Sequence, residues 1–158
     1  MTKLDLYNDE AYGLAAAAYQ LADTRHTGGA DNVIARCAVD SEKFPVTILN
    51  DAGNLVGFFC LHIGKGPERY GFSGDEVILL RAFSIDDRFR RQGYASSALT
   101  ELSKFIHQRI SAEIREVILA VNSENIVAQK TYEKSGFIKL SQTFEGKLGT
   151  LFIMKKEL

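Results

Sequence analysis

Residues 76–95 read Glu-Val-Ile-Leu-Leu-Arg-Ala-Phe-Ser-Ile-Asp-Asp-Arg-Phe-Arg-Arg-Gln-Gly-Tyr-Ala, and this stretch decides the fold. The apolar run from Val77 to Ile85 predicts a strand, and a basic, glycine-containing segment after it opens into an amphipathic stretch. A strand that leads into a helix N-terminus leaves free backbone N–H groups and a positive dipole end there. Gly93 lets a phosphate approach the backbone closely, and Arg90 and Arg91 add positive charge. The segment therefore predicts a pyrophosphate-binding site.

Two common pyrophosphate-binding patterns are absent from the chain. No stretch matches the dinucleotide fingerprint G-x-G-x-x-G. Gly64-Lys65-Gly66 lacks both the earlier glycine and the following Ser or Thr of a Walker motif. Residues 90–95, Arg-Arg-Gln-Gly-Tyr-Ala, instead resemble the acetyl-CoA-binding motif of the GNAT N-acetyltransferase superfamily, Arg/Gln-x-x-Gly-x-Gly/Ala. Their place between a predicted strand and a predicted helix makes this resemblance specific.

A second block resembles the fifth strand and the following helix of the same family. Residues 117–137 read Val-Ile-Leu-Ala-Val-Asn-Ser-Glu-Asn-Ile-Val-Ala-Gln-Lys-Thr-Tyr-Glu-Lys-Ser-Gly-Phe. Residues 117–121 alone predict a short buried strand, and Asn122 or Ser123 is a suitable N-cap for a helix that stops at Gly136. The order of the two blocks is that of the family.

The rest of the chain predicts antiparallel strands first and a strand–helix–strand unit after them. Expected strands are residues 4–7, 45–49, 55–63, 137–144 and 150–154, expected helices are 8–22, 32–39 and 94–109, and expected loops are 24–31 and 64–75. We therefore expect an α/β (α+β) fold with a mixed, mostly antiparallel sheet of about seven strands, flanked by about four helices. The resemblance implies a GNAT-type fold in which the fourth and fifth strands splay apart.

Composition is compatible with one domain over residues 1–158. The chain is 46% hydrophobic, which is enough for a substantial core, and its net charge of −1 gives no electrostatic footprint for nucleic acid or an anionic membrane. The first residues lack the apolar core of a signal peptide, and no run approaches membrane-spanning length, so we expect a cytoplasmic protein. Cys37 and Cys60 are isolated, which favours reduced core thiols over a disulfide.

The resemblance implies where acetyl-CoA would bind. The pantetheine arm would lie between the splayed strands and pair with the main chain of Phe83 and Ile85, around Ser84, as an added strand would. Asn122 and Asn125 would lie near the arm, although an N-cap role explains Asn122 equally well. The pyrophosphate would contact the loop and the first helical turn, which consist of Arg90, Arg91, Gln92, Gly93, Tyr94, Ala95 and Ser96. Arg91 departs from the family, which often has glycine at this position.

The resemblance also implies the chemistry, which is direct attack of a neutral amine on the thioester. Tyr132 matches the family tyrosine that protonates the departing thiolate, and a phenol suits this task because it is neutral near pH 7. The alternative is a tyrosine that only packs on the core.

The general base is less clear. Glu76 is the best carboxylate available, although a glutamate at a strand start is usually solvated. His62 and His107 are alternatives, and a water chain to solvent is another. No metal is expected, because the pair Cys60-x-His62 lacks further ligands.

Strict alternation along the strand that begins after Glu76 predicts which side chains share a face. It puts Val77, Leu79, Arg81, Phe83 and Ile85 on the face opposite Glu76. On that face Arg81 is a candidate to hold an anionic group of the substrate or to pair with an internal carboxylate.

The chain is therefore expected to be an acetyl-CoA-dependent N-acetyltransferase acting on a primary amine of a small molecule or a peptide. One alternative is a catalytically inactive CoA-binding sensor or partner protein of the same fold. Another is an ATP- or GTP-binding regulator, against which the lack of a Mg²⁺-binding arrangement near the loop argues. The apolar residues 151–154 and family habit suggest a homodimer. The identity of the acceptor cannot be read from the sequence.

Overall fold

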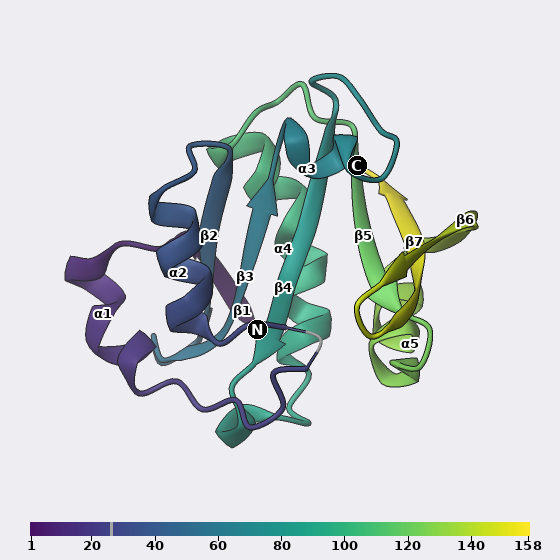
Figure 1. Cartoon of the computed structure of the whole chain (residues 1–158). Coiled ribbons are helices and arrows are strands. Elements are labelled where there is room, and N and C mark those ends of the chain that lie inside the picture. The colour runs from purple at the N-terminus through teal and green to yellow at the C-terminus, as the bar shows by residue number, and fades with distance from the viewer. Residues whose placement is uncertain (26) are drawn as a thin grey trace.

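Over residues 1–25 and 27–158, which the computed structural model describes, the chain forms a seven-stranded sheet (Figure 1). The strands are β1 (Thr2–Leu6), β2 (Lys43–Asn50), β3 (Leu55–His62), β4 (Val77–Ile85), β5 (Glu116–Asn122), β6 (Ile138–Gly146) and β7 (Gly149–Glu157). Their order in the sheet is β1-β2-β3-β4-β5-β7-β6. In the described part of the chain β4 and β5 pair in parallel and the other neighbouring strands are antiparallel. The predicted mixed, mostly antiparallel sheet is confirmed.

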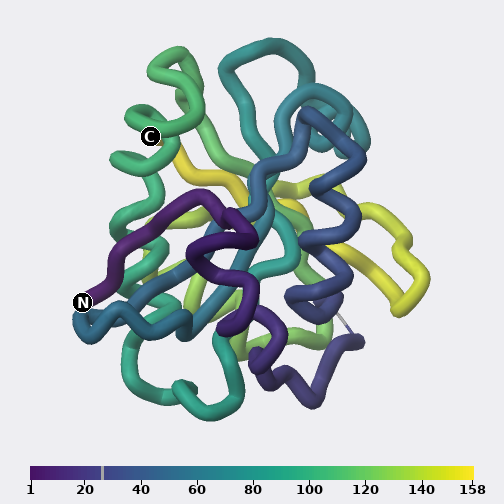
Figure 2. Tube along the Cα trace, turned by 90° about the vertical axis from the view of Figure 1, so that its left-hand side faces the viewer, coloured from purple at the N-terminus to yellow at the C-terminus, as the bar shows by residue number. Residues whose placement is uncertain are grey.

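Helices cover both faces of the sheet. They are α1 (Asp9–Ala17), α2 (Ala30–Ala38), α3 (Lys65–Glu68), α4 (Tyr94–Arg109) and α5 (Ile126–Lys134). Figure 2 shows α2 and α4 on opposite sides of the sheet, and α5 packs on the same side as α4. The single-turn α3 lies inside the segment 64–75, for which the sequence predicted a loop alone. None of the helices in the described residues is long and apolar enough to cross a membrane.

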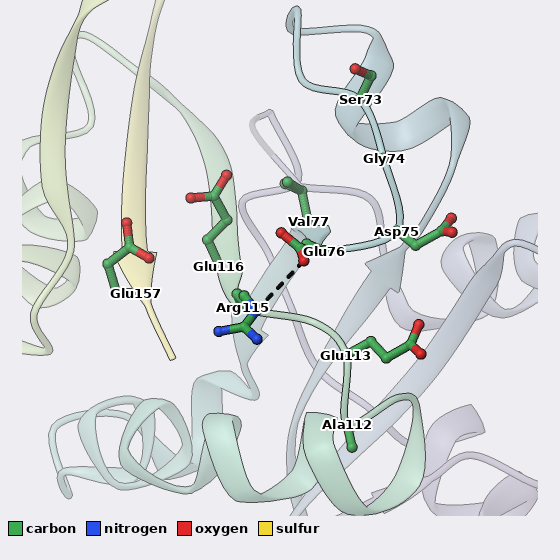
Figure 3. Close-up of a pocket in the computed structure, with 10 residues that line it drawn as sticks. All are labelled: Ser73, Gly74, Asp75, Glu76, Val77, Ala112, Glu113, Arg115, Glu116 and Glu157. Atoms are coloured by element: carbon green, nitrogen blue, oxygen red, sulfur yellow. Dashed lines mark ion pairs between the residues drawn. The ribbon is translucent and has the colours of Figure 1, made fainter.

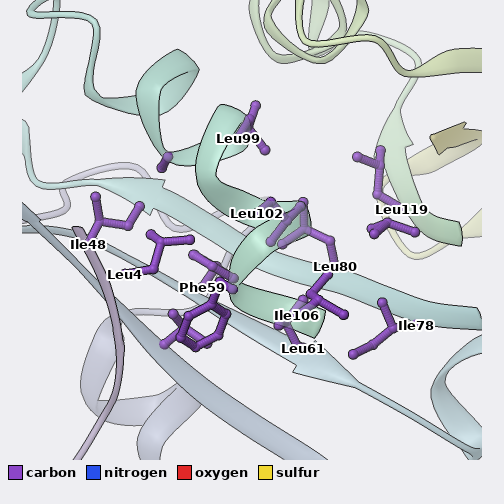
Figure 4. Close-up of a cluster of buried hydrophobic side chains, with 14 of the residues drawn as sticks. Leu4, Ile48, Phe59, Leu61, Ile78, Leu80, Leu99, Leu102, Ile106 and Leu119 are labelled. Carbon is purple, nitrogen blue, oxygen red and sulfur yellow. The ribbon is translucent and has the colours of Figure 1, made fainter. Parts of the chain in front are cut away.

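The main hydrophobic core lies between α4 and the sheet. Apolar residues that recur every three or four positions place one stripe of α4 against the strands, as the sequence predicted. On this stripe Ala98, Leu99, Leu102 and Ile106 are almost completely buried. Figure 4 shows three of them next to residues from β1 to β5 that include Phe59. The contact fixes the position of the helix N-terminus relative to the end of β4.

The parallel pairing between β4 and β5 is short. Val77–Leu79 of β4 pairs with 116–118 of β5, after which the two strands have no shared register although both continue. Figure 1 shows them diverging. The splayed fourth and fifth strands that the resemblance implied are therefore present. One edge of residues 80–85 is left without a neighbouring strand, because β3 occupies the other edge.

A β-bulge interrupts β4 within residues 80–85, where the strand pairs with β3 alone. Phe58 pairs with Ser84 and Cys60 pairs with Arg81, so both residues 82 and 83 lie opposite residue 59. Ala82 has φ 56°, a left-handed conformation that is strained for a residue with a side chain. The bulge shifts the inward–outward alternation by one residue for the rest of the strand.

The prediction that Val77, Leu79, Arg81, Phe83 and Ile85 share one face is therefore wrong. Val77 and Leu79 pack away from α4, whereas Phe83 and Ile85 pack against the α4-side core. Strict alternation holds only in an unbroken strand, and the bulge at Ala82 breaks it.

The C-terminal strand β7 lies inside the sheet, between β5 and β6. Ile153 and Met154 have no exposed surface, and their burial takes place within this chain. Ile153 and Met154 are consequently used for internal packing, whereas Leu151 and Phe152 are only partly buried. The homodimer stays a prediction. Sedimentation at micromolar concentration remains the direct measurement of the oligomeric state.

Candidate functional site

A helix N-terminus with free N–H groups follows β4. Gly93 has φ 80° and ψ 10°, a left-handed conformation that glycine adopts without steric cost, and it begins α4 without a side-chain cap. The first helical turn contains no acidic residue. Ser97 donates to the Gly93 carbonyl, while the N–H groups of residues 94–96 have no acceptor among the described residues. This geometry suits the binding of a phosphate group.

The residues before Gly93 are exposed and adopt an unusual backbone conformation. Arg91 has φ 63°, a left-handed conformation, at the position where the resembled family often has glycine. Arg90 forms an ion pair with Asp87, with 3.3 Å between its Nε and Oδ1. Because both partners have access to solvent, this pair leaves Arg90 available to a ligand.

We expect Arg91→Gly to stabilise the protein by about 1 kcal/mol, because glycine relieves the left-handed strain at this position. For a domain of this size the melting temperature would then rise by about 2–4 °C. The matched control is Gln92→Gly, whose native φ is not positive, and which we expect to lower the melting temperature. Thermal unfolding of both variants measures the difference, and a decrease for Arg91→Gly would contradict the argument.

The loop after β4 is held by a buried carboxylate that sequence reasoning missed. Asp86 is completely buried and accepts from the backbone N–H groups of Gln20 (3.0 Å) and Arg88 (2.9 Å). The Arg88 guanidinium binds both carboxylate oxygens, at 3.0 Å and 2.8 Å, so Arg88 is not a free surface charge. Burial opposes the charge on Asp86, but the hydrogen bonds from Arg88 and Gln20 outweigh it and lower the pKa.

This interaction explains why α1 ends earlier than predicted. The sequence predicted a helix over residues 8–22, but α1 ends at Ala17. The chain after it hydrogen-bonds to the loop beyond β4 instead. The backbone N–H of Asp87 donates to the Gln20 carbonyl at 2.7 Å, and the backbone N–H of Ala22 donates to the Asp87 carboxylate at 2.7 Å. The segment around Gln20 is thereby tied to the candidate phosphate site.

A cavity of about 260 Å³ occupies the space between the diverging β4 and β5. Its lining brings together four residues that the sequence proposed for the site, namely Phe83, Asn122, Asn125 and Tyr132. Ser84 does not line it; its hydroxyl lies 2.8 Å from that of Tyr19. Ile85 follows on the unpaired edge of β4, toward the Gly93 loop.

Aromatic contacts hold the ring of Tyr132. It lies edge-on to Phe83, with centroids 6.2 Å apart, and to Phe137 at 5.7 Å. The bulge in β4 makes the first contact possible, because it turns Phe83 toward this side of the sheet. Burial raises the pKa of Tyr132, and its hydroxyl has no hydrogen-bond partner among the described residues. A neutral phenol, whose O–H group is available to donate to a ligand, therefore lines the cavity.

The two asparagines support the end of β5. The N-cap of α5 is Asn125, which accepts from the N–H of Ala128 at 3.3 Å, so the prediction of Asn122 or Ser123 as the cap is wrong. The Asn122 amide instead donates to the Leu148 carbonyl (2.9 Å) and accepts from the N–H of Glu124 (2.9 Å). The polar atoms of Asn122 are thus already used within the chain to hold the β6–β7 turn beside the cavity.

A buried glutamine, which sequence reasoning also missed, secures the same corner. The Gln129 side chain donates to the carbonyls of Asn122 (3.0 Å) and Ser123 (3.1 Å). A polar residue in a helix carries no local signal of this role, because its partners lie at the end of the preceding strand.

The structure does not bring Glu76 to Tyr132. Glu76 precedes the paired end of β4 and lines a surface hollow with Arg115, 3.5 Å away, as Figure 3 shows. Tyr132 instead lines the cavity at the splayed end, and no carboxylate does so among the described residues. Both side chains of the Glu76–Arg115 pair are mostly exposed, which fits a solvated surface interaction.

The two histidines considered as bases have structural partners. His107 lies 2.7 Å from the Ile114 carbonyl through Nε2. The Nδ1 of His62 lies 3.2 Å from an Nη of Arg81, and because a guanidinium only donates, Nδ1 accepts and Nε2 carries the proton. Burial lowers the pKa of His62, with a further contribution from the charges of Arg81 and Lys43.

His62 also belongs to a possible ligand group with Asp40 and Glu42, whose ligand atoms lie within 4.8 Å of one another. The hydrogen bond from Arg81 puts the proton on the nitrogen that faces Asp40, which disfavours a cation there. Cys60, the other half of the pair that the sequence suggested, lies 3.5 Å from the sulfur of Cys37. Both cysteines are buried and free, as predicted.

Comparisons with known proteins agree on one family. The model of the acetyltransferase (GNAT) family matches residues 7–137. The uncharacterized N-acetyltransferase YbbJ of Bacillus subtilis (strain 168) is 33% identical over 132 residues, which cover 84% of this chain and 81% of that protein.

Solved structures share the fold at low sequence identity. The aminoglycoside acetyltransferase AAC(6')-Ib in complex with coenzyme A has a TM-score of 0.76 at 14% identity, covering 99% of this chain and 95% of that one. A spermidine N-acetyltransferase SpeG chimera from Vibrio cholerae and hSSAT has a TM-score of 0.68 at 14% identity, covering 99% and 95%. A putative phosphinothricin N-acetyltransferase has a TM-score of 0.65 at 19% identity, covering 100% and 99%.

Proposed function

The chain belongs to the acetyltransferase (GNAT) family, and from this premise we propose that it is an acetyl-CoA-dependent N-acetyltransferase acting on a primary amine of a small molecule or a peptide. The observation that carries the proposal is the continuity of the site. The unpaired edge of β4, the loop before Gly93 and the free N–H groups of α4 follow one another along the chain. Acetyl-CoA matches this order, because its thioester lies at the end of an extended arm that leads to a pyrophosphate.

Main-chain groups of β4 would bind the arm of the cosubstrate. Amides of an extended ligand pair with an exposed strand edge as an additional strand would, and Phe83 to Ile85 offer such an edge beside the cavity. Arg90, Arg91 and the N–H groups of residues 94–96 would hold the pyrophosphate. Asn122 acts indirectly in this proposal, because its amide holds the β6–β7 turn.

The reaction would be direct attack. The amine nitrogen forms a bond to the thioester carbonyl carbon, the carbon–sulfur bond breaks, and the thiolate takes the proton of Tyr132. Arg25, Arg69, Arg81 and Lys147 line the cavity, where no described carboxylate does, so the ammonium form of a bound amine is disfavoured. Because the amine is bound neutral and no described carboxylate lines the cavity, water is the proposed acceptor of the proton that the amine loses after attack. Glu76 has no part in this mechanism.

A CoA-binding protein without catalytic activity is the second candidate, and the lack of a carboxylate base in the cavity is the observation that favours it. Release of free thiol from acetyl-CoA in the presence of a panel of amines (amino acids, polyamines, aminoglycosides and peptide N-termini) separates the two. Acetyl-CoA binding without thiol release from any amine would favour the inactive protein.

Acetyl-CoA is expected to raise the melting temperature more than ATP or NADH at the same concentration. A ligand that binds only the native state at 100 times its Kd adds about 2.7 kcal/mol to the free energy of unfolding. The double variant Arg90→Ala/Gly93→Asp should lose most of this effect, because a carboxylate replaces the open space in front of the helix N-terminus. A larger shift with ATP would contradict the proposal.

The matched control is Gly53→Asp. Gly53 has φ 82° and, like Gly93, has nothing within 4 Å of an added Cβ, so both substitutions introduce similar backbone strain. We expect Gly53→Asp to lower the melting temperature without changing the shift caused by acetyl-CoA. Normal acetyl-CoA binding by a folded Arg90→Ala/Gly93→Asp variant would place the pyrophosphate elsewhere.

A further inference from the structure

A second cavity adjoins the first and shares part of its lining. Its volume is about 730 Å³, and α2, the segment before it and β4 line it. The two cavities share lining residues on both sides of the β4–β5 gap, including Arg81 and Ala82 of β4 and Ala120 of β5. A molecule on the α2 side could therefore reach the place where Tyr132 lies.

The charged residues around the two cavities are almost all cationic. In the cavity between the strands, four cations and none of the described carboxylates contribute to the lining. The second cavity adds two cations and one carboxylate, Asp31. The cations are Arg25, Arg36, Lys43, Arg69, Arg81 and Lys147.

Two of these cations, Arg25 and Arg81, line both cavities, and Arg81 is the one that belongs to the sheet. It precedes the bulge, lines both cavities and is only partly exposed. Its hydrogen-bond partner is neutral His62, and none of the described carboxylates lies within ion-pair distance of its guanidinium. Arg25 and Lys43, by contrast, have ion-pair partners in Asp23 and Asp40.

An arginine in this setting favours an anion. Partial burial weakens hydration of the guanidinium, and its fork of donors matches a carboxylate with two hydrogen bonds. A carboxylate supplied by a ligand would fill the place that no described side chain fills. A polycationic amine would instead meet repulsion from the whole lining.

We propose that the acceptor is an amino acid or a similar small amine with a carboxylate, and that Arg81 binds this carboxylate and determines specificity. The inference rests on the proposed acetyl transfer. Acetylation gives an uncharged amide and leaves the carboxylate, so the reactive neutral-amine form of the acceptor and its product both carry a net negative charge, which suits the cationic lining. The solved structures whose names refer to aminoglycosides or spermidine are similar to this chain in fold alone, so they do not bear on its acceptor.

The test compares the rate of acetylation of each amino acid with that of its own amide and that of its decarboxylated amine, for example leucine, leucinamide and isoamylamine. Spermidine is tested as a further, polycationic substrate. These ligands keep the reacting amine and change the anionic group. With purified protein and acetyl-CoA, we expect kcat/KM to be at least about tenfold higher for the best amino acid than for its amide, given the strength of charge-assisted hydrogen bonds.

Arg81→Gln should remove this preference by raising KM for the amino acid about 10- to 100-fold, with little change for the amide. Arg81→Lys, which keeps the charge and loses the fork, should be intermediate. The control Lys104→Gln changes an exposed cation on α4 outside both cavities and should leave the preference unchanged. The melting-temperature shift with acetyl-CoA verifies that each variant is folded.

Failure of the inference and failure of the proposed function are distinguishable. Efficient acetylation of amides or spermidine with no preference for amino acids would leave acetyl transfer intact and overturn the role of Arg81. If acetyl-CoA binds but no amine is acetylated, the proposed function fails. Binding of the same amino acids in the presence of CoA, followed by calorimetry, then tests Arg81 separately, and equal binding to wild type and Arg81→Gln would overturn the inference.

Discussion

Tyr132→Phe is expected to lower kcat by about 10²- to 10⁴-fold, the range typical of a lost general acid. The ring remains in contact with Phe83 and Phe137, and no described group loses a hydrogen bond, so the fold and the affinity for acetyl-CoA should change little. The hydroxyl is needed when negative charge develops on sulfur, and the loss should therefore appear in kcat. Steady-state rates with an identified acceptor measure it.

The matched control is Tyr7→Phe, which removes an exposed hydroxyl that donates to Asp9 and lines neither cavity. Its rate should match that of wild type.

Because burial raises the pKa of Tyr132 above the ordinary value of 10.0, the phenol stays protonated across neutral pH, and its ionisation should lower the rate only in strongly alkaline solution. If Tyr132→Phe stays within about threefold of wild type in single-turnover experiments, the tyrosine is a packing residue.

Asp86→Ala is expected to lower the free energy of unfolding by about 1–3 kcal/mol, the range typical when buried hydrogen-bonding groups lose their partner. The substitution leaves the N–H groups of Gln20 and Arg88 without their acceptor and releases the Arg88 guanidinium. Chemical denaturation measures the loss. The control Glu76→Ala removes an exposed ion pair with Arg115 and should cost less than about 1 kcal/mol.

The same carboxylate predicts a pH dependence. The pKa of Asp86 in the folded state lies below its ordinary value of 3.8, so the unfolded state binds more protons as the solution is acidified. The stabilisation by Asp86 is therefore present above the ordinary pKa and is lost as the pH falls through the folded pKa. Asp86→Asn should flatten the decline of stability in acid, and an unchanged decline would contradict this assignment.

The sequence by itself determined the elements whose signals are local. The run from Val77 to Ile85, Gly93 and the apolar stripe of α4 each depend on neighbouring residues, and all have the predicted structure. The order of β4, the loop and α4 is enforced by chain connectivity. For this reason the sheet and the place of the candidate phosphate site could be predicted without coordinates, and the resemblance of residues 90–95 and 117–137 indicated the family.

Tertiary structure decided the side-chain arrangement of the site. The bulge at Ala82 depends on pairing with β3, and it determines that Phe83 contacts Tyr132 while Arg81 faces the second cavity. Glu76 is separated from Tyr132 because β4 and β5 diverge only beyond Leu79.

The cationic lining also depends on tertiary structure, because it combines residues such as Arg25, Arg69 and Lys147 from segments far apart in the chain. Charges in loops carry no periodic signal, and packing of the whole chain determines which of them share a cavity.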